Sequence, residues 1–565
     1  MPKKVLVVGG VAGGASVAAR VRRLDEYAEV TMFERGPYVS FSNCSLPFYF
    51  SNMIENSQDM VLMNPEQFKK QYNINAKVQH EVIKIKPEEK KVVVKDLANE
   101  EVFEEAYDAL YLSPGAEAIL PPSIKGIDSD NVFVVKTVPD VDKIDAYIKA
   151  NNVQDVTVVG GGYIGLEVME NLKMAGLNVT LVEACDQVLL PYDKDITQII
   201  QKEIIDNDVN LVINDCITEI HPDKVVTESK KEIKAQMVIM AIGVKPEVAL
   251  AKDAGIEIGQ TGGIKVDANF RTNKKDIYAV GDAIETFCSI SHKPTRLPLA
   301  GPAQRQARAA ADNFYGRPVN NRGIIGSSCI RLFDLNIANT GFNEKQCQEQ
   351  GYQYDFVYLI PSDKVGIIPG AAPMHLKLIF EVPTGRILGC QAVGKGNVDK
   401  RVDVIATMIT MNGTLDDLKE LELCYSPMFN TAKDPLNHAA LTGLNILNGE
   451  YKQIKVSEVR DIVENGGFIM DCREADEFAQ GHVKGAHNIP MSEFRDRLDE
   501  IPKDEPVYVH CRSGQRSYNT VRALNQMGYD KVYNISGSFL GISYYEYFED
   551  VTNNREKIVT EYNFN

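Results

Sequence analysis

Two stretches of the chain repeat one pattern, in which a short apolar run leads through glycines into a sequence with helical spacing. Residues 4–8 (KVLVV) and 155–159 (DVTVV) are mostly apolar, which is typical of parallel strands buried on both faces. Each run is followed by a Gly-rich turn and then by apolar residues at intervals of three and four. The two copies predict two strand–turn–helix units of an α/β fold with parallel sheets.

The glycines of both turns are spaced so that the backbone can approach a phosphate group. The second turn carries the complete GxGxxG pattern at Gly160, Gly162 and Gly165. In the first turn Gly9 and Gly14 hold the outer positions, but Val11 stands in the middle. Such a loop directs backbone N–H groups at a helix N-terminus toward a pyrophosphate, and the alternative is a simple tight turn. Two such loops predict two bound dinucleotides.

An acidic residue ends the strand that follows each Gly-rich unit. Glu34 lies 20 residues beyond Gly14, and Glu183 ends the apolar run NVTLVE. A carboxylate at this place accepts a hydrogen bond from a ribose 2′-hydroxyl and repels a 2′-phosphate. No Lys or Arg occurs from Glu183 through Leu190, so the second site is predicted to prefer NADH over NADPH.

Composition limits the classes of protein and partner. The chain has 565 residues, of which 44% are hydrophobic, so three or four domains are expected. Its net charge of −17 argues against nucleic acid as a partner, and no apolar run reaches membrane-spanning length. The start of the chain has no signal-peptide pattern, so a cytoplasmic protein is expected.

Ten cysteines lie at irregular spacing without any CxxC pair. This distribution predicts reduced thiols rather than a disulfide framework or a zinc site. Most of a group of seven are expected to be small residues of the core. These are Cys185, Cys216, Cys288, Cys329, Cys347, Cys390 and Cys424. Cys472 is expected to be buried in a strand.

A third segment makes the pattern specific. The run IYAVGD ends at Asp282, and a helix is expected to follow near the PLAGPAQRQARAAA stretch. This segment resembles the second flavin motif of the disulfide reductases that bind two dinucleotides, in which the acid holds the ribityl chain of FAD. YLSPGAEA from Tyr111 and AIGVKP from Ala241 resemble the two crossovers between the flavin and nicotinamide domains of that family. The resemblance covers about residues 1 to 445 and implies FAD at the first loop and NADH at the second.

The resemblance also implies domain boundaries and cofactor contacts. FAD-binding segments are expected at 1–116 and 246–322 around an NADH-binding domain at 117–245, followed by a dimerisation domain at 323–445 and a linker at 446–455. The resemblance implies a homodimer. The implied cofactor-binding residues are Gly9, Gly10, Gly14, Glu34, Arg35, Ser113, Gly115, Asp282 and Ala300 for FAD, and Gly160, Gly162, Gly165, Glu183 and Gly243 for NADH.

Cys44 decides the branch of the family. Glutathione-type reductases carry a second redox cysteine five positions later, but position 49 here is Tyr49. A lone thiol can form a mixed disulfide, a persulfide or a sulfenic acid, and we expect Cys44 to react as a thiolate beside the flavin. The surrounding SFSNCSLPFY resembles coenzyme A disulfide reductases, and Asn43 separates it from the oxidases and peroxidases of the superfamily. The alternative is a buried structural cysteine.

The same resemblance suggests contacts for coenzyme A. Arg20, Arg22 and Arg23 lie on the first helix, and Phe68, Lys69 and Lys70 on a helix that begins with proline. Together they are predicted to form a basic patch for the nucleotide end, with Arg20, Arg23, Ser40, Phe68 and Lys70 as substrate-binding residues and Asn43 near the thiol. The alternative is that these are solvated helix faces.

One departure from the family concerns the leaving group. The family carries two tyrosines near the reacting sulfurs, supplied by the dimer partner, and one of them matches Tyr425. The other position falls in KVGIIPG, where Ile367 and Ile368 replace aromatic hydroxyls. With one donor missing, a small leaving group such as hydrosulfide is favoured over a bulky thiolate. The sequence therefore favours coenzyme A persulfide over coenzyme A disulfide.

The C-terminal part carries a different set of motifs. DCRE, GHVKGAHNIP and CRSGQRS together resemble a rhodanese domain over residues 451–550. With the linker at 446–455, the domain is expected to span 456–565. Cys511 opens a loop that leads to a helix, where inward N–H groups lower a thiol pKa and can hold a persulfide. Arg512 and Arg516 add positive charge. In a phosphatase loop the arginine stands six residues after the cysteine, whereas Arg516 stands five after Cys511.

These observations predict an α/β enzyme with two Rossmann-like domains, an α+β dimerisation domain and an α/β rhodanese domain. It is expected to reduce small-molecule persulfides or disulfides with NADH and FAD through Cys44, and to transfer sulfur through Cys511, with Asn43, Tyr425 and Arg516 as further catalytic residues. The alternatives are an NADH oxidase or peroxidase with a Cys44 sulfenic acid, and a C-terminal domain that only docks or senses sulfur.

Overall fold

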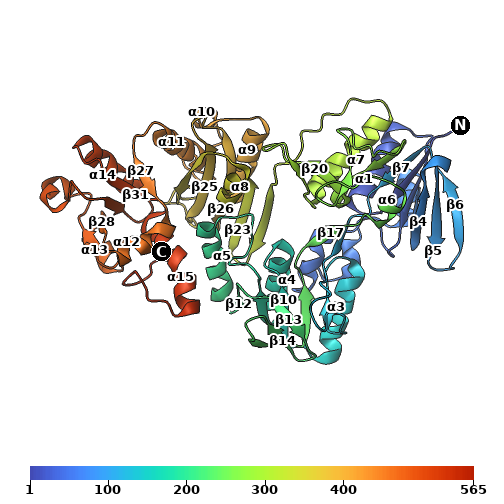
Figure 1. Ribbon diagram of the computed structural model, residues 1–565, viewed down its shortest axis with the longest axis horizontal. Helices are drawn as coiled ribbons and strands as arrows, with labels where there is room; N and C mark the ends of the chain where they lie inside the picture. Colours follow the sequence, from blue (N-terminus) through green and yellow to red (C-terminus); the bar gives the residue numbers. More distant parts are fainter. Residues whose placement is uncertain (565) are drawn as a thin grey trace. The chain divides into compact units, whose positions relative to one another are not determined.

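The computed structural model describes residues 1–564, which fold into two compact units (Figure 1). One unit comprises 1–184 and 215–324, and the other comprises 185–214 and the chain from 325 onward. Each unit contains parallel or antiparallel sheets with helices packed against them. Among the described residues, no helix combines the length and apolar character needed to cross a bilayer.

The first sheet of the first unit is parallel and draws its strands from distant parts of the chain. Its order is β19-β7-β1-β2-β3, and helices α1 and α7 pack against each other beside it (Figure 1). A three-stranded antiparallel sheet, β4-β5-β6, adjoins it. The bounds are β1 Lys4–Val8, α1 Ala12–Leu24, β2 Glu29–Glu34, α2 Pro65–Tyr72, β3 Ile74–Val78, β4 His80–Lys86, β5 Lys91–Asp96, β6 Val102–Ala106, β7 Ala109–Leu112, β19 Ile277–Ala279 and α7 Ala300–Phe314.

A second parallel sheet of the same unit contains the strand order β11-β10-β16-β9 and repeats the strand–loop–helix arrangement of the first. Two short antiparallel strands, β8 and β17, pair where the chain passes between the two sheet regions. The bounds are β8 Ala116–Ala118, β9 Val132–Phe133, α3 Val138–Asn151, β10 Asp155–Val159, α4 Tyr163–Met174, β11 Asn178–Val182, β13 Ile217–Ile220, β14 Lys224–Thr227, β15 Glu232–Lys234, β16 Met237–Met240, β17 Val244–Pro246, α6 Ala249–Asp253, β18 Ile264–Lys265, β20 Ile284–Phe287 and β21 Pro294–Thr295.

The second unit contains a five-stranded antiparallel sheet of order β22-β23-β26-β25-β24, with helix α9 packed on β23 and β26. Strand β26 is buried along its whole length, and β25 is buried as far as Phe380. The bounds are α5 Lys194–Asp206, β22 Ser328–Leu332, β23 Leu335–Gly341, α8 Glu344–Gln350, β24 Tyr354–Leu359, β25 Met374–Glu381, β26 Ile387–Gly394, α9 Val398–Thr410, α10 Leu415–Lys419 and α11 Pro435–Leu447.

The C-terminal domain of this unit is a parallel sheet of order β27-β31-β30-β28-β29 with helices around it (Figure 1). Strands β28 and β30 lie side by side in its centre, so the residues that follow them meet at one edge. The bounds are β27 Lys452–Ile454, α12 Val459–Glu464, β28 Phe468–Asp471, α13 Ala475–Ala479, β29 His487–Asn488, β30 Val507–His510, α14 Gln515–Gln526, β31 Val532–Ile535 and α15 Ser538–Asn553.

The cysteines do not follow the expectation that most of the group of seven belong to the core. Only Cys347 and Cys390 of that group are buried, whereas Cys216, Cys329 and Cys424 are exposed. The reason is position, because the exposed ones lie in surface loops or on the open face of an edge strand. Cys472 is buried, as expected, but it lies directly after strand β28. No disulfide links any of the ten thiols.

Candidate functional site

The first Gly-rich loop, between β1 and α1, is built so that only glycine fits. A Cβ on Gly9 would overlap the carbonyl oxygen of Ser113, and one on Gly14 would overlap the carbonyl oxygen of Gly9. Helix α1 begins after Val11 without any side-chain cap, so its first N–H groups remain available for an anion. This cradle fits the pyrophosphate of a dinucleotide.

The acid at the end of β2 is tied to the same loop. The Glu34 carboxylate accepts from the N–H groups of Gly10 and Gly36, both at 2.8 Å. Ser40 adopts a left-handed conformation (φ 49°), and its N–H donates to the Gly10 carbonyl at 2.8 Å. Arg35, in contrast, forms a two-pronged ion pair with Glu247, with both N–O distances at 2.8 Å. The structure therefore gathers Gly10, Glu34 and Ser40 around one loop.

The second Gly-rich loop, between β10 and α4, repeats this construction. A Cβ on Gly165 would overlap the carbonyl oxygen of Gly160, and Gly162 precedes helix α4 without a side-chain cap. Glu183 accepts from the N–H of Gly161 at 2.6 Å, as Glu34 does in the first loop. Gly243 has a positive φ of 111° beside strand β17. The residues present fit a second dinucleotide.

Other predicted flavin contacts lie at the carboxyl edge of the first sheet. Ser113 follows β7 and donates its N–H to Val8 at 2.8 Å, and Asp282 follows β19. Ala300 is the first residue of helix α7, as the sequence predicts for that helix, and Gly115 has a φ of 79°. Burial raises the pKa of Asp282, while the positive charge of Lys136 opposes that rise.

Cys44 lies in a short 3-10 helix, Asn43–Tyr49, and is exposed. Partial burial of its thiol raises the pKa of Cys44, and the negative charges of Glu167 and Asp282 raise it further. The groups that the chain itself supplies therefore disfavour the thiolate that the sequence analysis expects here. Asn43 beside it donates weakly to the Lys136 carbonyl at 3.4 Å.

Glu167, which was not among the predicted site residues, acts on the charge of Cys44 from the second Gly-rich helix. It lies in α4 two residues after Gly165, and burial, together with the charge of Glu170, raises its pKa to about 7. A carboxyl group with this pKa changes charge in the neutral range and alters the field at the thiol. The sequence feature that could have identified Glu167 is its place in the first turns of a helix that begins at a phosphate-binding loop.

The predicted basic patch is only partly exposed. Arg20 is 9% exposed and forms a charged hydrogen bond from Nε to Asp312 at 2.8 Å, and Arg22 donates to five backbone carbonyls. Phe68 is 2% exposed and belongs to the core of the first sheet. These three side chains have their partners inside the domain, and their contact with substrate stays a prediction. Arg23 and Lys70 are exposed.

Cys511 is the most enclosed of the predicted nucleophiles, at 1% exposure, and follows strand β30. Its sulfur accepts from the N–H of Gly514 at 3.1 Å and from the hydroxyl of Ser517 at 3.7 Å. Gly514 adopts φ 110°, which aims its N–H at the sulfur just before helix α14. The Ser538 hydroxyl lies 3.9 Å away, and its oxygen accepts from the Cys511 N–H at 3.3 Å.

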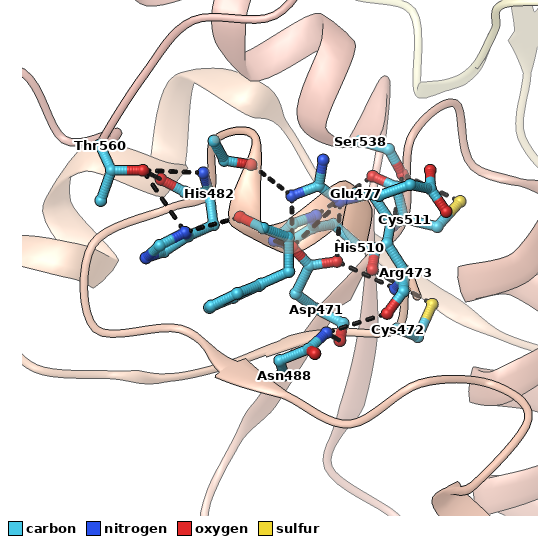
Figure 2. Close-up of polar contacts among 12 residues, drawn as sticks. Asp471, Cys472, Arg473, Glu477, His482, Asn488, His510, Cys511, Ser538 and Thr560 are labelled. Carbon is cyan, nitrogen blue, oxygen red and sulfur yellow. Dashed lines mark hydrogen bonds and ion pairs between the residues drawn. The ribbon is translucent and has the colours of Figure 1, made fainter. Parts of the chain in front are cut away.

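The pKa of Cys511 lies well below its ordinary value. Burial raises the pKa of Cys511, but interactions with the Cys472 thiol, the N–H and hydroxyl of Ser517 and the N–H of Gly514 lower it by more. The Cys472 thiol shows the opposite effect, since burial and its donation to Cys511 raise its pKa well above the ordinary value. The two side chains lie on the same side of the cluster in Figure 2.

A buried ion pair supports this edge of the sheet. Arg473 donates from Nη2 to Asp471 at 2.6 Å (Figure 2). It also donates to the Gly481 carbonyl at 2.7 Å, and its guanidinium stacks on Phe539 at 4.1 Å from the ring centroid. A pocket of about 160 Å³ opens beside it. The pocket is lined by Arg473, Glu477, Gln480, Arg512, Phe539, Leu540 and Asn563.

The predicted catalytic arginine is engaged rather than free. Arg516 forms a two-pronged pair with Glu477 at 2.5 and 2.7 Å, which offsets much of the positive charge expected of it. Tyr425 is 51% exposed in a loop of the other domain of this unit. The described residues contain no cluster of side chains suited to a metal ion.

Comparison with known proteins matches three segments of the chain to family models. Residues 3–307 match the family model of pyridine nucleotide-disulphide oxidoreductases, residues 328–435 match the dimerisation domain of that family, and residues 455–544 match the rhodanese-like domain. A coenzyme A disulfide reductase of Staphylococcus epidermidis is 35% identical over 435 residues, which cover 77% of this chain and 98% of the relative.

Two solved structures resemble the chain over nearly its full length. Reduced Bacillus anthracis CoADR-RHD is 43% identical with a TM-score of 0.93, covering 96% of this chain and 98% of the other. An NAD-dependent persulfide reductase from A. fulgidus is 33% identical with a TM-score of 0.90, covering 95% and 99%. The predicted fold class is confirmed by these matches.

Proposed function

Because the chain belongs to the pyridine nucleotide-disulphide oxidoreductase family and carries a rhodanese-like domain, we propose that it is an NADH-dependent reductase of coenzyme A persulfide. Hydrogen sulfide and free coenzyme A are the products, and the rhodanese-like domain transfers sulfur through Cys511. The observation that carries the proposal is a pair of unlinked cysteines. The charge of Asp282 in the predicted flavin site acts on Cys44, and the sulfur of Cys511 accepts from the N–H of Gly514.

The reductase uses FAD and NADH, and small-molecule disulfides or persulfides are its class of substrate. The loop of Gly9 and Gly14, with Glu34 and Asp282, is proposed to hold FAD, and the loop of Gly160 and Gly165, with Glu183, to hold NADH. When bound, the pair delivers two electrons to the sulfur chemistry. The side chain of Glu183 supports NADH over NADPH, because a carboxylate repels a 2′-phosphate.

Cys44 is the proposed nucleophile of the reductase half. Its exposure supports attack on a substrate sulfur, which forms either a mixed disulfide or a protein persulfide. Since its pKa is raised by burial, Glu167 and Asp282, the thiol must lose its proton before it attacks. The Glu167 carboxyl, with a pKa of about 7, is close enough to influence that charge and is proposed to tune it.

Hydrosulfide is the proposed leaving group. Ile367, which is 89% exposed, and Ile368 stand where the family has an aromatic hydroxyl, so Tyr425 alone can donate to a leaving thiolate. The exposed Arg23 and Lys70, with Ser40 and Asn43, remain the proposed contacts for coenzyme A. The buried Arg20 and Phe68 are left out of that set.

A homodimer is proposed from the apolar side chains that the dimerisation domain exposes. Tyr425, Met428 and Phe429 are each more than half exposed. Their loop is fixed by the buried Arg401, which donates to Asn430 at 3.0 Å and also to Asp363 near Ile367 at 3.2 Å. Fixed, exposed apolar loops are typical of an interface. A single-chain mass in sedimentation at micromolar concentration would contradict the dimer.

The two halves can be separated by substitution of each cysteine. Cys44→Ser should lower NADH-dependent hydrosulfide release at least about a thousandfold and leave sulfur transfer to a small thiol intact. Cys511→Ser should abolish sulfur transfer and leave NADH-dependent hydrosulfide release intact. Cys424→Ser, at another exposed thiol, is the control. The substrates are coenzyme A persulfide and coenzyme A disulfide, assayed side by side.

Three outcomes would count against the proposal. A faster reaction with the disulfide would reverse the substrate preference. Oxygen consumption equal to NADH consumption without a sulfur substrate would indicate an oxidase with a Cys44 sulfenic acid. Unchanged turnover on every sulfur substrate in the Cys511→Ser variant would reduce the rhodanese-like domain to a docking or sensing module.

A further inference from the structure

Cys472 is a second thiol at the sulfur-transfer site. Strands β28 and β30 pair in parallel as far as Asp471 opposite His510, and the residues that directly follow the two strands are Cys472 and Cys511. The ladder continues through this step, since the Cys472 N–H donates to the His510 carbonyl at 2.9 Å. The two cysteines are therefore register partners.

Residues that stand opposite each other on neighbouring strands have the Cα spacing that a disulfide needs. Adjacent strands lie about 4.8 Å apart, within the range of about 4.4–6.8 Å between Cα atoms that a disulfide spans. Both residues, at 0% and 1% exposure, belong to one buried cluster, and each thiol shifts the pKa of the other. The Cys472 thiol donates to the His510 carbonyl oxygen at 3.2 Å, which holds its sulfur at the end of the neighbouring strand.

We propose that Cys472 is a resolving thiol that displaces hydrosulfide from a persulfide on Cys511. The inference rests on the proposed sulfurtransferase function of Cys511. The Cys472 sulfur attacks the inner sulfur of the persulfide, the bond between the inner and outer sulfurs breaks, and a Cys472–Cys511 disulfide forms. The proton of the Cys472 thiol leaves with the outer sulfur as hydrosulfide, so atoms and charge balance.

Two small thiols complete the cycle. One opens the Cys472–Cys511 bond as a mixed disulfide, and the second releases a symmetric small-molecule disulfide and restores both thiols. In sum, a persulfide and a thiol give hydrogen sulfide and a disulfide. With coenzyme A as the thiol, that disulfide is a substrate for NADH-dependent reduction at Cys44. The two halves are thereby coupled through a diffusing product.

The pKa shifts fit this order of events. The depressed pKa of Cys511 keeps it as the first nucleophile, and the raised pKa of Cys472 keeps that thiol protonated until a leaving sulfur can take the proton. An isolated buried cysteine elsewhere offers a control. Cys390, in strand β26, is also fully buried, and its pKa is raised to about 12 by burial alone.

The test uses the full chain with Cys44→Ser, so that the reductase cannot release hydrosulfide. The chain is reduced, desalted and given one equivalent of coenzyme A persulfide, and then hydrosulfide, intact mass and non-reduced peptides are measured. Hydrosulfide release with a linked Cys472–Cys511 peptide is expected. Adding Cys472→Val should cut hydrosulfide release at least about tenfold and leave one extra sulfur on Cys511, whereas adding Cys390→Val should change nothing.

A chain that contains Cys472 and still keeps the persulfide on Cys511 would overturn the resolving role alone. A chain that takes up no sulfur at Cys511 would overturn the sulfurtransferase function, and the inference with it. Transfer of the outer sulfur to Cys472 as a new persulfide would also overturn it. The peptide analysis of the chain with native Cys472 decides these outcomes even if Cys472→Val does not fold.

Discussion

Cys44 and Cys511 differ both in exposure and in thiol pKa, and the more exposed of the two has the higher pKa. Cys44 is exposed, yet partial burial of its thiol and two nearby carboxylates raise its pKa. Cys511 is 1% exposed, yet donated hydrogen bonds bring its pKa well below the ordinary value. Exposure therefore does not decide thiolate character here. Directed donors decide it, because they act on the charged form alone.

The same difference gives the two regions opposite relations between pH and stability. A thiol with a depressed folded-state pKa contributes stability that is present above its unfolded pKa and is lost as pH falls through the folded value. Cys511 is in this class. Raised pKa values at Cys44 and Glu167 work the other way, because the folded state holds protons longer than the unfolded chain, and stability falls as pH rises between the two values.

The largest expected effect comes from removing the ion pair beneath Cys511. Arg473→Met leaves Asp471 buried at 0% exposure without its guanidinium partner. A loss of about 3–5 kcal/mol in the free energy of unfolding of the rhodanese-like domain is expected, measured by denaturant titration. Arg497→Met, which breaks a partly exposed pair with Glu493 and Glu500, should cost less than about 1 kcal/mol. Equal losses of unfolding free energy in Arg473→Met and Arg497→Met would contradict the conclusion that burial makes the Arg473–Asp471 pair the more costly one to break.

A smaller effect should follow from weakening the donors at Cys511. Ser517→Ala removes a hydroxyl 3.7 Å from the sulfur that also reaches the Gly514 carbonyl at 3.0 Å. The acid limb of the sulfur-transfer pH profile should rise by about half a pH unit, because the thiolate loses part of its stabilisation. Ser543→Ala is the matched control, since that hydroxyl is buried without a partner among the described residues. A profile unmoved by Ser517→Ala would assign the low pKa to the remaining donors.

The smallest effect concerns Cys44. Glu167→Gln removes a negative charge that raises the pKa of Cys44, so NADH-dependent turnover should increase about two- to threefold at pH 8. The variants should converge below pH 6, because Glu167, with a pKa of about 7, is then neutral in the native protein. Glu66→Gln, at an exposed site on helix α2, should show no such difference. A uniform change at all pH values would point to a packing effect.

Local sequence predicted much of the frame around these sites. The glycine spacing of the Gly9–Gly14 and Gly160–Gly165 loops is a contiguous motif, so it was enough to place two phosphate cradles. The strand that precedes Cys511 and the helix that follows it were predicted for the same reason. The basic patch was not, because whether Arg20 meets solvent or Asp312 depends on a helix nearly 300 residues away.

The sequence alone determined the family and the two dinucleotide loops, and it predicts Cys44 and Cys511 as the nucleophiles, since each of these is encoded in a contiguous motif. Only the tertiary structure decided which thiol is stabilised as a thiolate and what stands beside it. Cys472 and Cys511 are 39 positions apart in the chain and meet because two parallel strands share a register. Electric fields and hydrogen bonds act through space, and the distances on which they depend are set by packing between segments rather than by order along the chain.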